Sequence, residues 1–193
     1  MNEPSETARI TTDSRGRAYW ASRPYALAVA EEVKHADIVI LPQEREKDGG
    51  EPAFPVGTEE LLLFLRDSLP NGTTVDVAVV EDEYRELALH GALLIVGAFL
   101  TTAIAVPILV NVVSEYIKKK IWRESSDQVR VKILVERRPG DLETVAIEYE
   151  GPSKAFAEAM TGALAKALAE EVPGARAQNM PNALPPKSTG SSE

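Results

Sequence analysis

The sequence predicts an α+β fold with one central transmembrane helix, a small N-terminal αβαβ piece, and a C-terminal β-hairpin followed by a helix (ββα). The first observation is a run over residues 87–113 that contains no Asp, Glu, Lys or Arg. It exceeds the roughly 20 apolar residues that cross a bilayer as a helix. Helical and extended patterns alternate over residues 19–83, and two alternating segments joined by a turn lie within 127–172. The alternative for the run is a central helix buried on all sides by a folded domain.

The composition excludes several kinds of site. The 193 residues include no cysteine, so disulfides, thiolate catalysis and cysteine-ligated metals are ruled out. Only His35 and His90 carry imidazoles, which nearly removes histidine-based metal sites. The net charge of −9 argues against nucleic acid as a partner, because phosphate contacts need clustered Lys and Arg. We therefore expect no metal and no cofactor.

The N-terminal piece follows a polar segment over residues 1–18, which we expect to be a disordered tail. Residue spacing then predicts a helix over 22–35, a strand over 37–41, a loop over 42–57, a helix over 58–69 and a strand over 75–80. Thr58 is placed to cap the second helix. A strand, a crossover helix and a second strand imply a parallel pair with a right-handed connection.

The predicted membrane segment carries small residues, a proline and two polar side chains. Small residues at four-residue steps let a second helix approach closely, which favours self-association; the alternative is that they pack against nothing in particular. The expected packing residues are Gly97, Thr101 and Ala105, with Ala98 and Thr102 alongside. Pro107 is expected to kink the helix, because it has no backbone N–H. His90 and Asn111 are intramembrane polar candidates for an ion-contact role, unless they simply reach the interface.

Charged and aromatic residues beyond the run predict its orientation. Residues 114–126 indicate a basic juxtamembrane helix, with membrane-surface contacts from Lys118, Lys119, Lys120, Trp122 and Arg123. Because Lys and Arg gather on this side, the positive-inside rule places the C-terminus in the cytoplasm, and we expect a single pass through a bacterial inner membrane. In the alternative topology both flanks share the cytoplasm and build one joint sheet beside a re-entrant or interfacial hairpin.

The C-terminal piece combines a hairpin and a helix. Val129, Val131, Ile133 and Val135 alternate with polar or outward residues, and residues 145–149 repeat the alternation after a Pro-Gly turn. A helix then runs from about Pro152 to Val172, with an apolar side formed by Phe156, Met160, Leu164 and Leu168. Residues 173–193 are rich in Pro, Ser, Gly and Asn and are expected to be a disordered tail.

Three functional hypotheses are compatible with this organisation. The first is a small, non-enzymatic, oligomeric membrane effector or signalling component, in which the central helix self-associates. The second is a membrane-anchored binding or accessory module of the immunity type, which docks a protein partner through the ββα piece. The third is an enzyme with a carboxylate site in the 42–57 loop, formed by Glu44, Glu46, Asp48 and Glu51. Acidic runs of this kind are usually only solvated, and the scarcity of His weakens the third hypothesis.

Overall fold

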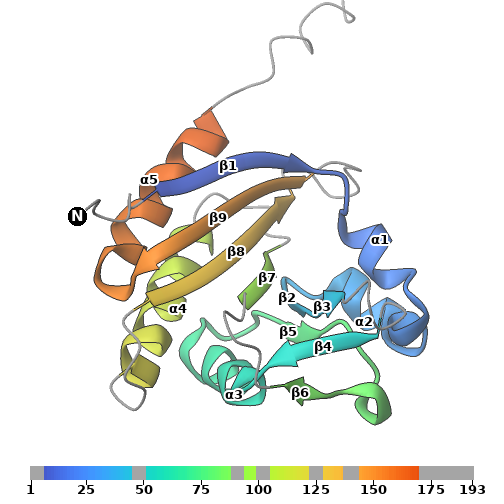
Figure 1. The fold of residues 1–193 in the computed structure, drawn as a ribbon. Coiled ribbons are helices and arrows are strands. Elements are labelled where there is room, and N and C mark those ends of the chain that lie inside the picture. Colours follow the sequence, from blue (N-terminus) through green and yellow to red (C-terminus); the bar gives the residue numbers. More distant parts are fainter. Residues whose placement is uncertain are drawn as a thin grey trace, which may run out of the picture.

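A six-stranded mixed sheet runs through the molecule in the order β1-β9-β8-β7-β2-β5 (Figure 1). This computed structural model describes residues 7–44, 51–87, 94–98, 105–121, 128–136 and 144–169. The strands of the sheet are β1 (Thr7–Asp13), β2 (Ile38–Leu41), β5 (Val75–Val77), β7 (Leu94–Ala98), β8 (Gln128–Glu136) and β9 (Thr144–Pro152). Strand β7 lies parallel to β8 and antiparallel to β2, so it joins strands from the two ends of the chain.

A second, three-stranded sheet and several helices surround the main sheet. The small sheet has the order β3-β4-β6, formed by β3 (Gln43–Glu44), β4 (Pro52–Pro55) and β6 (Glu86–Leu87). The helices are α1 (Arg17–Ala21), α2 (Ala30–His35), α3 (Thr58–Ser68), α4 (Ala105–Ile121) and α5 (Phe156–Ala169). Within the described residues, short 3-10 segments are η1 (Pro24–Val29), η3 (Glu81–Glu83) and η4 (Ser153–Ala155).

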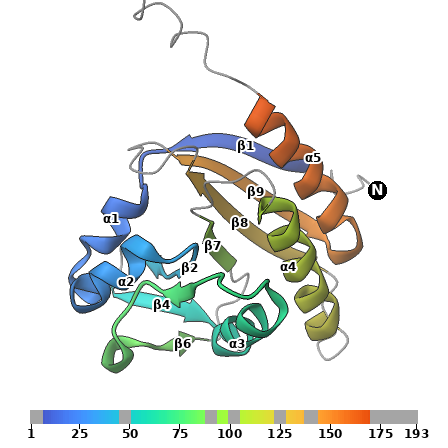
Figure 2. The ribbon, with the colours of Figure 1, turned by 180° about the vertical axis from the view of Figure 1, so that it is seen from behind.

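The two faces of the main sheet are covered unequally. Helices α3, α4 and α5 pack on one face, where Ile133, Ile147 and Phe156 belong to the large core. Figure 2 shows α4 and α5 in front of β8 and β9. On the other face, α1 and α2 contribute Trp20 and Val33 to a smaller core over β2. Among the described residues, this second core reaches β8 at Leu134 and β9 at Ala146, and it includes no residue of β1.

The prediction of a transmembrane helix over residues 87–113 is wrong. Leu87 ends β6, residues 94–98 form strand β7, and α4 begins only at Ala105; the remaining residues of the run lie outside the described ranges. Among the helices that the structure describes, none combines the length and the apolar character needed to cross a bilayer. The predicted single pass, with its inner-membrane location and cytoplasmic C-terminus, is therefore overturned. The physical reason is that a strand in the middle of a sheet is flanked by protein on both faces and so also reads as an uncharged run.

Helix α4 is a core helix with a proline in its first turn. Leu109, Val113 and Tyr116 are buried, and the ring of Tyr116 lies 5.7 Å from that of Phe64 on α3. Pro107 is the third residue of α4, where its missing N–H would have no partner within the helix. In the helix as described it lies in the first turn, and the membrane helix that it was expected to kink is not present among the described helices.

Several elements expected from residue patterns occur in the structure. Strands β2 and β5 pair in parallel with α3 between them in sequence, and β8 pairs antiparallel with β9. The α+β class therefore stands, without the membrane helix. Strand β7 pairs with both β2 and β8, so strands from both flanks of the charge-free run belong to one sheet. Residues 7–13, expected in a disordered tail, form β1 and pair with β9 along their whole length. The predicted tail over 173–193 lies outside the described residues.

Glu86 holds the beginning of α3 in place. Its carboxylate accepts hydrogen bonds from the backbone N–H of Gly57 at 2.9 Å and of Glu59 at 2.8 Å, and from the Tyr84 hydroxyl at 2.7 Å. Gly57 has a φ of 91°, a left-handed conformation that glycine adopts without strain. Its carbonyl oxygen accepts a hydrogen bond from the hydroxyl of Tyr116 at 2.6 Å. A side chain from β6 thus satisfies amides that a helix N-terminus leaves free, as a local cap usually does.

Candidate functional site

One side of the β1-β9-β8 half of the sheet is charged. We define the open face by the side chains that this side presents: Arg9, Thr11, Arg130, Lys132, Glu148 and Glu150. Pairing places Arg9 opposite Glu148, and Glu148 in turn opposite Lys132. In Figure 1 this side of the three strands faces the viewer, and no described helix lies across it. Basic and acidic residues therefore alternate from strand to strand on a surface whose reverse side is covered by α4 and α5.

Two cross-strand ion pairs organise the open face. The Arg130 guanidinium lies 3.0 Å from the Glu150 carboxylate, and both side chains are mostly exposed, at 51% and 68%. The ammonium group of Lys132 lies 3.0 Å from the carboxylate of Glu148. Directly opposed charges of this kind stabilise a sheet by up to about 1 kcal/mol each. The pairing also fixes the direction in which these long side chains point.

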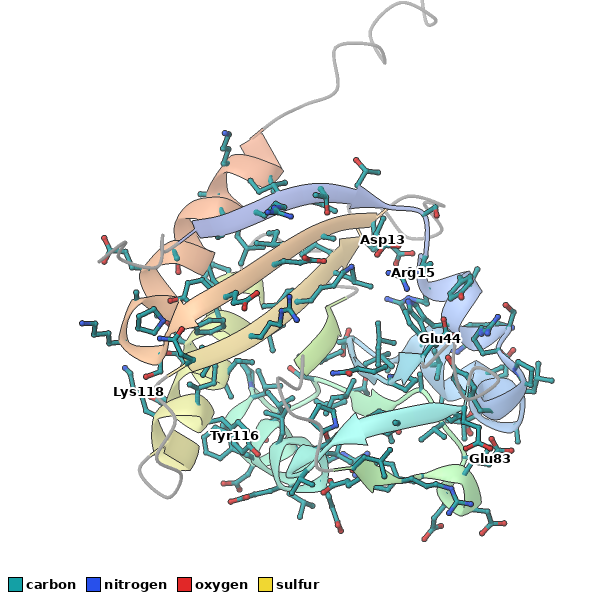
Figure 3. The ribbon with its side chains drawn as sticks, viewed as in Figure 1. Asp13, Arg15, Glu44, Glu83, Tyr116 and Lys118 are labelled. Atoms are coloured by element: carbon teal, nitrogen blue, oxygen red, sulfur yellow. The ribbon has the colours of Figure 1, made fainter. Side chains whose placement is uncertain are left out.

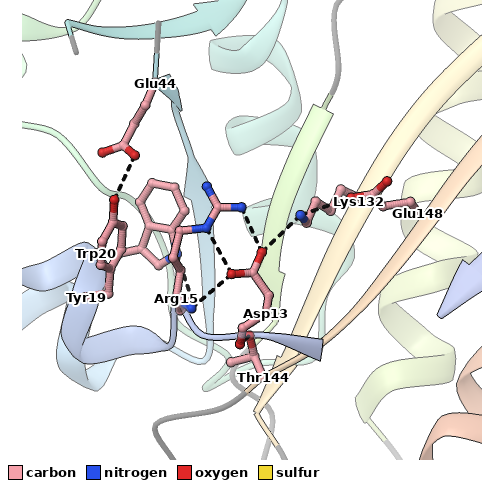
Figure 4. Close-up of polar contacts among 8 residues, drawn as sticks. All are labelled: Asp13, Arg15, Tyr19, Trp20, Glu44, Lys132, Thr144 and Glu148. Carbon is pink, nitrogen blue, oxygen red and sulfur yellow. Dashed lines mark hydrogen bonds and ion pairs between the residues drawn. The ribbon is translucent and has the colours of Figure 1, made fainter. Parts of the chain in front are cut away.

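At the inner end of the open face, Asp13 binds two cations (Figure 4). Its Oδ2 atom lies 2.8 Å from Nη2 of Arg15 and 3.0 Å from Nζ of Lys132, and Nε of Arg15 donates to its Oδ1 at 2.9 Å. The backbone N–H of Arg15 also donates to Oδ1. Asp13 and Lys132 are only 9% and 10% exposed at their side chains. This Asp13 network, made of Asp13, Arg15, Lys132 and Glu148, connects β1, β8 and β9.

The network shifts the pKa values of Asp13 and Arg15. Hydrogen bonds from the Arg15 side chain hold the pKa of Asp13 far below its usual value, and they outweigh the burial that would raise it. The same hydrogen bonds raise the pKa of Arg15 above its ordinary value, against the effect of burial. Asp13 is thus an anion and Arg15 a cation throughout the physiological range. The Asp13 carboxylate therefore accepts hydrogen bonds and carries no proton that it could donate as a general acid.

Aromatic residues of α1 and η1 border the network on one side. The indole N–H of Trp20 donates to the carbonyl oxygen of Arg15 at 3.1 Å, and the guanidinium carbon of Arg15 lies 5.6 Å from the indole centroid. Beyond Trp20, the hydroxyls of Tyr19 and Tyr25 each donate to Glu44 at 2.9 Å. Burial, followed by the Glu44 carboxylate, raises the pKa of Tyr25, so this phenol stays protonated. Figure 3 shows Arg15 and Glu44 on the same side of the molecule, next to the end of the sheet.

A second buried pair fixes α1 to the end of β8. Glu136, 2% exposed, lies 3.3 Å from the Nε atom of Arg17, and Arg17 also donates to the carbonyl oxygen of Lys34. Beside it, the Thr144 hydroxyl donates to the carbonyl oxygen of Asp13 at 3.0 Å. These contacts join α1 to the end of β8 and the start of β9 to the end of β1, at the border of the open face.

The residues predicted to pack membrane helices do not share one helix. Gly97 and Ala98 lie in β7, where Gly97 is paired with Val39 and Leu134, whereas Ala105 is the first residue of α4. Thr101 and Thr102 lie outside the described residues. A strand separated from a helix cannot present these residues as a single stripe, so the structure offers no such packing surface among the described positions.

The predicted polar and membrane-surface residues lie partly on α4 and partly outside the described residues. Asn111 is an exposed residue of α4, and His90 lies outside the described ranges. Lys118 and Lys119 are exposed on α4, and the ammonium group of Lys119 lies 4.3 Å from the Phe64 ring centroid. Lys120 belongs to α4 as well, and Trp122 and Arg123 fall outside the described part. Lys119 is thus engaged with α3 by a cation–π contact.

The acidic loop over 42–57 is not assembled as a carboxylate cluster in the described residues. Glu44 is held by Tyr19, Tyr25 and Arg23, whose Nε atom lies 2.6 Å from its carboxylate. Pro52–Pro55 forms β4, and Glu46 and Asp48 lie outside the described ranges. Within residues 7–44 and 51–87 and the shorter described stretches, no group of three His, Asp or Glu residues could hold a metal ion.

Sequence reasoning missed the residues of the open face. Residue spacing predicts the hairpin, but it does not single out Arg130 or Lys132, and it predicts a tail over the residues that form β1. The available signal was the alternation in β1, where Ala8 and Ile10 alternate with Arg9, Thr11 and Asp13. The chain matches no protein-family model, no curated protein and no solved structure. What it does therefore has to be inferred from its own residues.

Proposed function

We propose that the chain is a non-enzymatic protein-binding module that docks its partner on the open face. The observation that carries this proposal is the uneven cover of the sheet: α4 and α5 bury one side of β8 and β9, while the other side presents exposed, oriented charges. The ββα piece supplies β8 and β9, so this proposal keeps the protein-docking part of the second hypothesis without its membrane anchor.

The charges of the open face favour a protein over a nucleic acid. Arg130 and Lys132 are each matched by a glutamate on β9, so the surface is no continuous basic stripe of the kind that phosphates require. A partner with a complementary alternation of Asp, Glu, Lys and Arg would meet opposite charges across the whole surface, which increases specificity and association rate. Because the Asp13 network already fixes Lys132, little side-chain entropy is lost there on binding.

Site-specific crosslinking tests the proposal in cells. A photoreactive phenylalanine analogue placed at Thr11 or Glu150 would lie on the open face, and the matched control position is Glu31, an exposed residue of α2 on another surface. We expect a discrete covalent adduct with one protein from the two open-face positions and none from the control. The same adduct from all three positions, or none from Thr11 and Glu150, would contradict the proposal.

A charge exchange provides the second control. The double variant Arg130→Glu with Glu150→Arg keeps the cross-strand ion pair and the net charge, but it reverses the pattern presented to the partner. The fold should be unaffected, because the pair lies on the exposed side of the strands. We expect the crosslinked adduct to be lost in this variant. Retention of the adduct at full yield would show that the partner does not read these charges.

A further inference from the structure

Strand β1 forms one edge of the main sheet. Its seven residues pair with β9 on one side, from Thr7 opposite Glu150 to Asp13 opposite Thr144, and no strand among the described residues pairs with its other side. Figures 1 and 2 both show β1 on the outside of the sheet, with α5 passing behind or in front of it according to the view. One row of backbone N–H and C=O groups therefore points away from the sheet.

Apart from its charged residues Arg9 and Asp13, strand β1 has none of the features that protect an exposed edge strand. Natural proteins blunt exposed edge strands with proline, lysine, a β-bulge or a very short length, because an open edge recruits other strands. Strand β1 (TARITTD) contains neither proline, glycine nor lysine, and its register with β9 is uninterrupted over all seven positions. At the opposite edge, β5 has only three residues, and Nη2 of Arg66 donates to the carbonyl oxygen of Val75. The β5 edge is thus short and partly bonded by Arg66, whereas the β1 edge is long and open.

The unpaired backbone N–H and C=O groups of an edge strand determine which kind of ligand can bind there. Only an extended peptide presents N–H and C=O groups at the alternating spacing that a strand edge requires. We infer that β1 accepts an added β-strand from an extended segment of the partner protein, next to the open face on which the remainder of that partner docks. This inference rests on the proposed function and names the form in which the partner is recognised.

The two sides of β1 specify the side chains of the added strand. Arg9 and Thr11 are exposed on the open face, and the acid opposite Arg9, Glu148, is already engaged by Lys132. An acidic residue on the added strand would give Arg9 a partner of opposite charge. On the other side, Ala8 and Ile10 are half-buried at the margin of the core beneath α5. The added strand should therefore alternate acidic residues on the open face with apolar residues beside Ile10.

A defined peptide tests this inference on the full chain. The probe is a capped heptapeptide in which glutamate and valine alternate, and the readout is the set of backbone amide NMR resonances. We expect saturable shifts concentrated in residues 7–13 and in the parts of α5 that pack on β1. The same peptide with N-methyl groups on alternate residues cannot form the strand ladder and should cause none. Equal shifts with the methylated peptide would overturn the inference.

A charge exchange separates the edge from the open face. Arg9→Glu should weaken the glutamate peptide about threefold and strengthen a lysine–valine peptide by a similar factor, as expected for one exposed ion pair. The matched control is Arg130→Glu, which changes an equally basic residue two strands away and should leave both affinities unchanged. If Arg130→Glu weakens the peptide as much as Arg9→Glu does, the peptide lies on the open face and the edge assignment is wrong.

Two further outcomes keep this inference distinct from the proposed function. If the peptide does not bind while crosslinking from Thr11 and Glu150 succeeds, strand addition fails and the open-face proposal survives. If both fail, the partner-binding function itself is rejected. Sedimentation of the full chain without peptide should show a monomer. A dimer that the peptide dissociates would replace the partner segment by a second copy of this chain and overturn the assignment of the occupant.

Discussion

The ammonium group of Lys132 lies 3.0 Å from Oδ2 of Asp13, so the C-terminal hairpin and the N-terminal strand are joined by a buried ion pair. Asp13→Asn removes the charge that faces both Lys132 and Arg15 and leaves Lys132 with Glu148 alone. We expect the free energy of unfolding, measured in urea, to fall by about 2 kcal/mol. Arg130→Gln breaks a pair on the same face that is largely exposed, and it should cost less than about 1 kcal/mol. Equal losses of unfolding free energy in Asp13→Asn and Arg130→Gln would contradict a larger effect of the buried ion pair.

The low pKa of Asp13 predicts how stability depends on pH. Because the folded state holds this carboxylate far below the ordinary aspartate value of about 4, the ionised form stabilises the fold above that value. The contribution is lost as the pH falls below about 4, since the unfolded state then binds a proton that the folded state still refuses. The wild-type chain should therefore lose more unfolding free energy between pH 6 and pH 3 than Asp13→Asn. Urea titrations at several pH values check this, and parallel curves would contradict it.

Glu86 should stabilise α3 although it belongs to another element. Glu86→Ala leaves the amides of Gly57 and Glu59 without their acceptor, and we expect a loss of about 1–2 kcal/mol in unfolding free energy. Glu59→Gln is the control, because Glu59 lies exposed in the first turn and acts only through the helix dipole. It should cost about 0.5 kcal/mol or less. A larger effect at Glu59 than at Glu86 would contradict the capping role.

Two glycines should respond to alanine in opposite directions. A Cβ at Gly151 would lie 2.9 Å from the hydroxyl oxygen of Tyr149, a buried ring whose hydroxyl donates to the carbonyl oxygen of Pro152. Gly151→Ala should therefore destabilise the fold by about 1–2 kcal/mol. A Cβ at Gly162, inside α5, meets nothing within 4 Å, so Gly162→Ala should stabilise by about 0.5–1 kcal/mol through helix propensity. Thermal unfolding measures both: stabilisation by Gly151→Ala would contradict the packing around Tyr149, and destabilisation by Gly162→Ala would contradict the helix-propensity argument.

Residue patterns predicted the elements whose partners are close in sequence. Strands β2 and β5, helix α3 and the β8–β9 hairpin each have a regular apolar spacing, and their local signals agree with their packing. Strand β7 could not be separated from α4 in this way, because a strand paired on both sides and a membrane helix share the absence of charge. The position of Pro107 is the sequence signal that could have corrected this prediction. A proline three residues into α4 fits the start of a helix better than its middle.

The candidate site was harder to predict because its members become neighbours only through distant strand pairing. Asp13, Lys132 and Glu148 come from three strands, and nothing in their local sequence indicates that β1 pairs with β9. Strand β1 has only one strongly apolar residue, Ile10, so the hydrophobic signal was weak. The polar segment whose composition predicts a tail therefore contains Asp13, which binds both Arg15 and Lys132.

The pairing of β1 with β9 also sets an order of events during synthesis. Residues 7–13 leave the ribosome well before residues 144–150, with which they pair. Loop closure over such a separation is slow, and domains are assembled as the chain emerges. The nascent chain must therefore carry β1 as an unpaired segment until residues 144–150 have emerged. A ribosome-bound chain arrested before residue 144 should have this segment open to proteases, and one arrested after residue 152 has passed the exit tunnel should not.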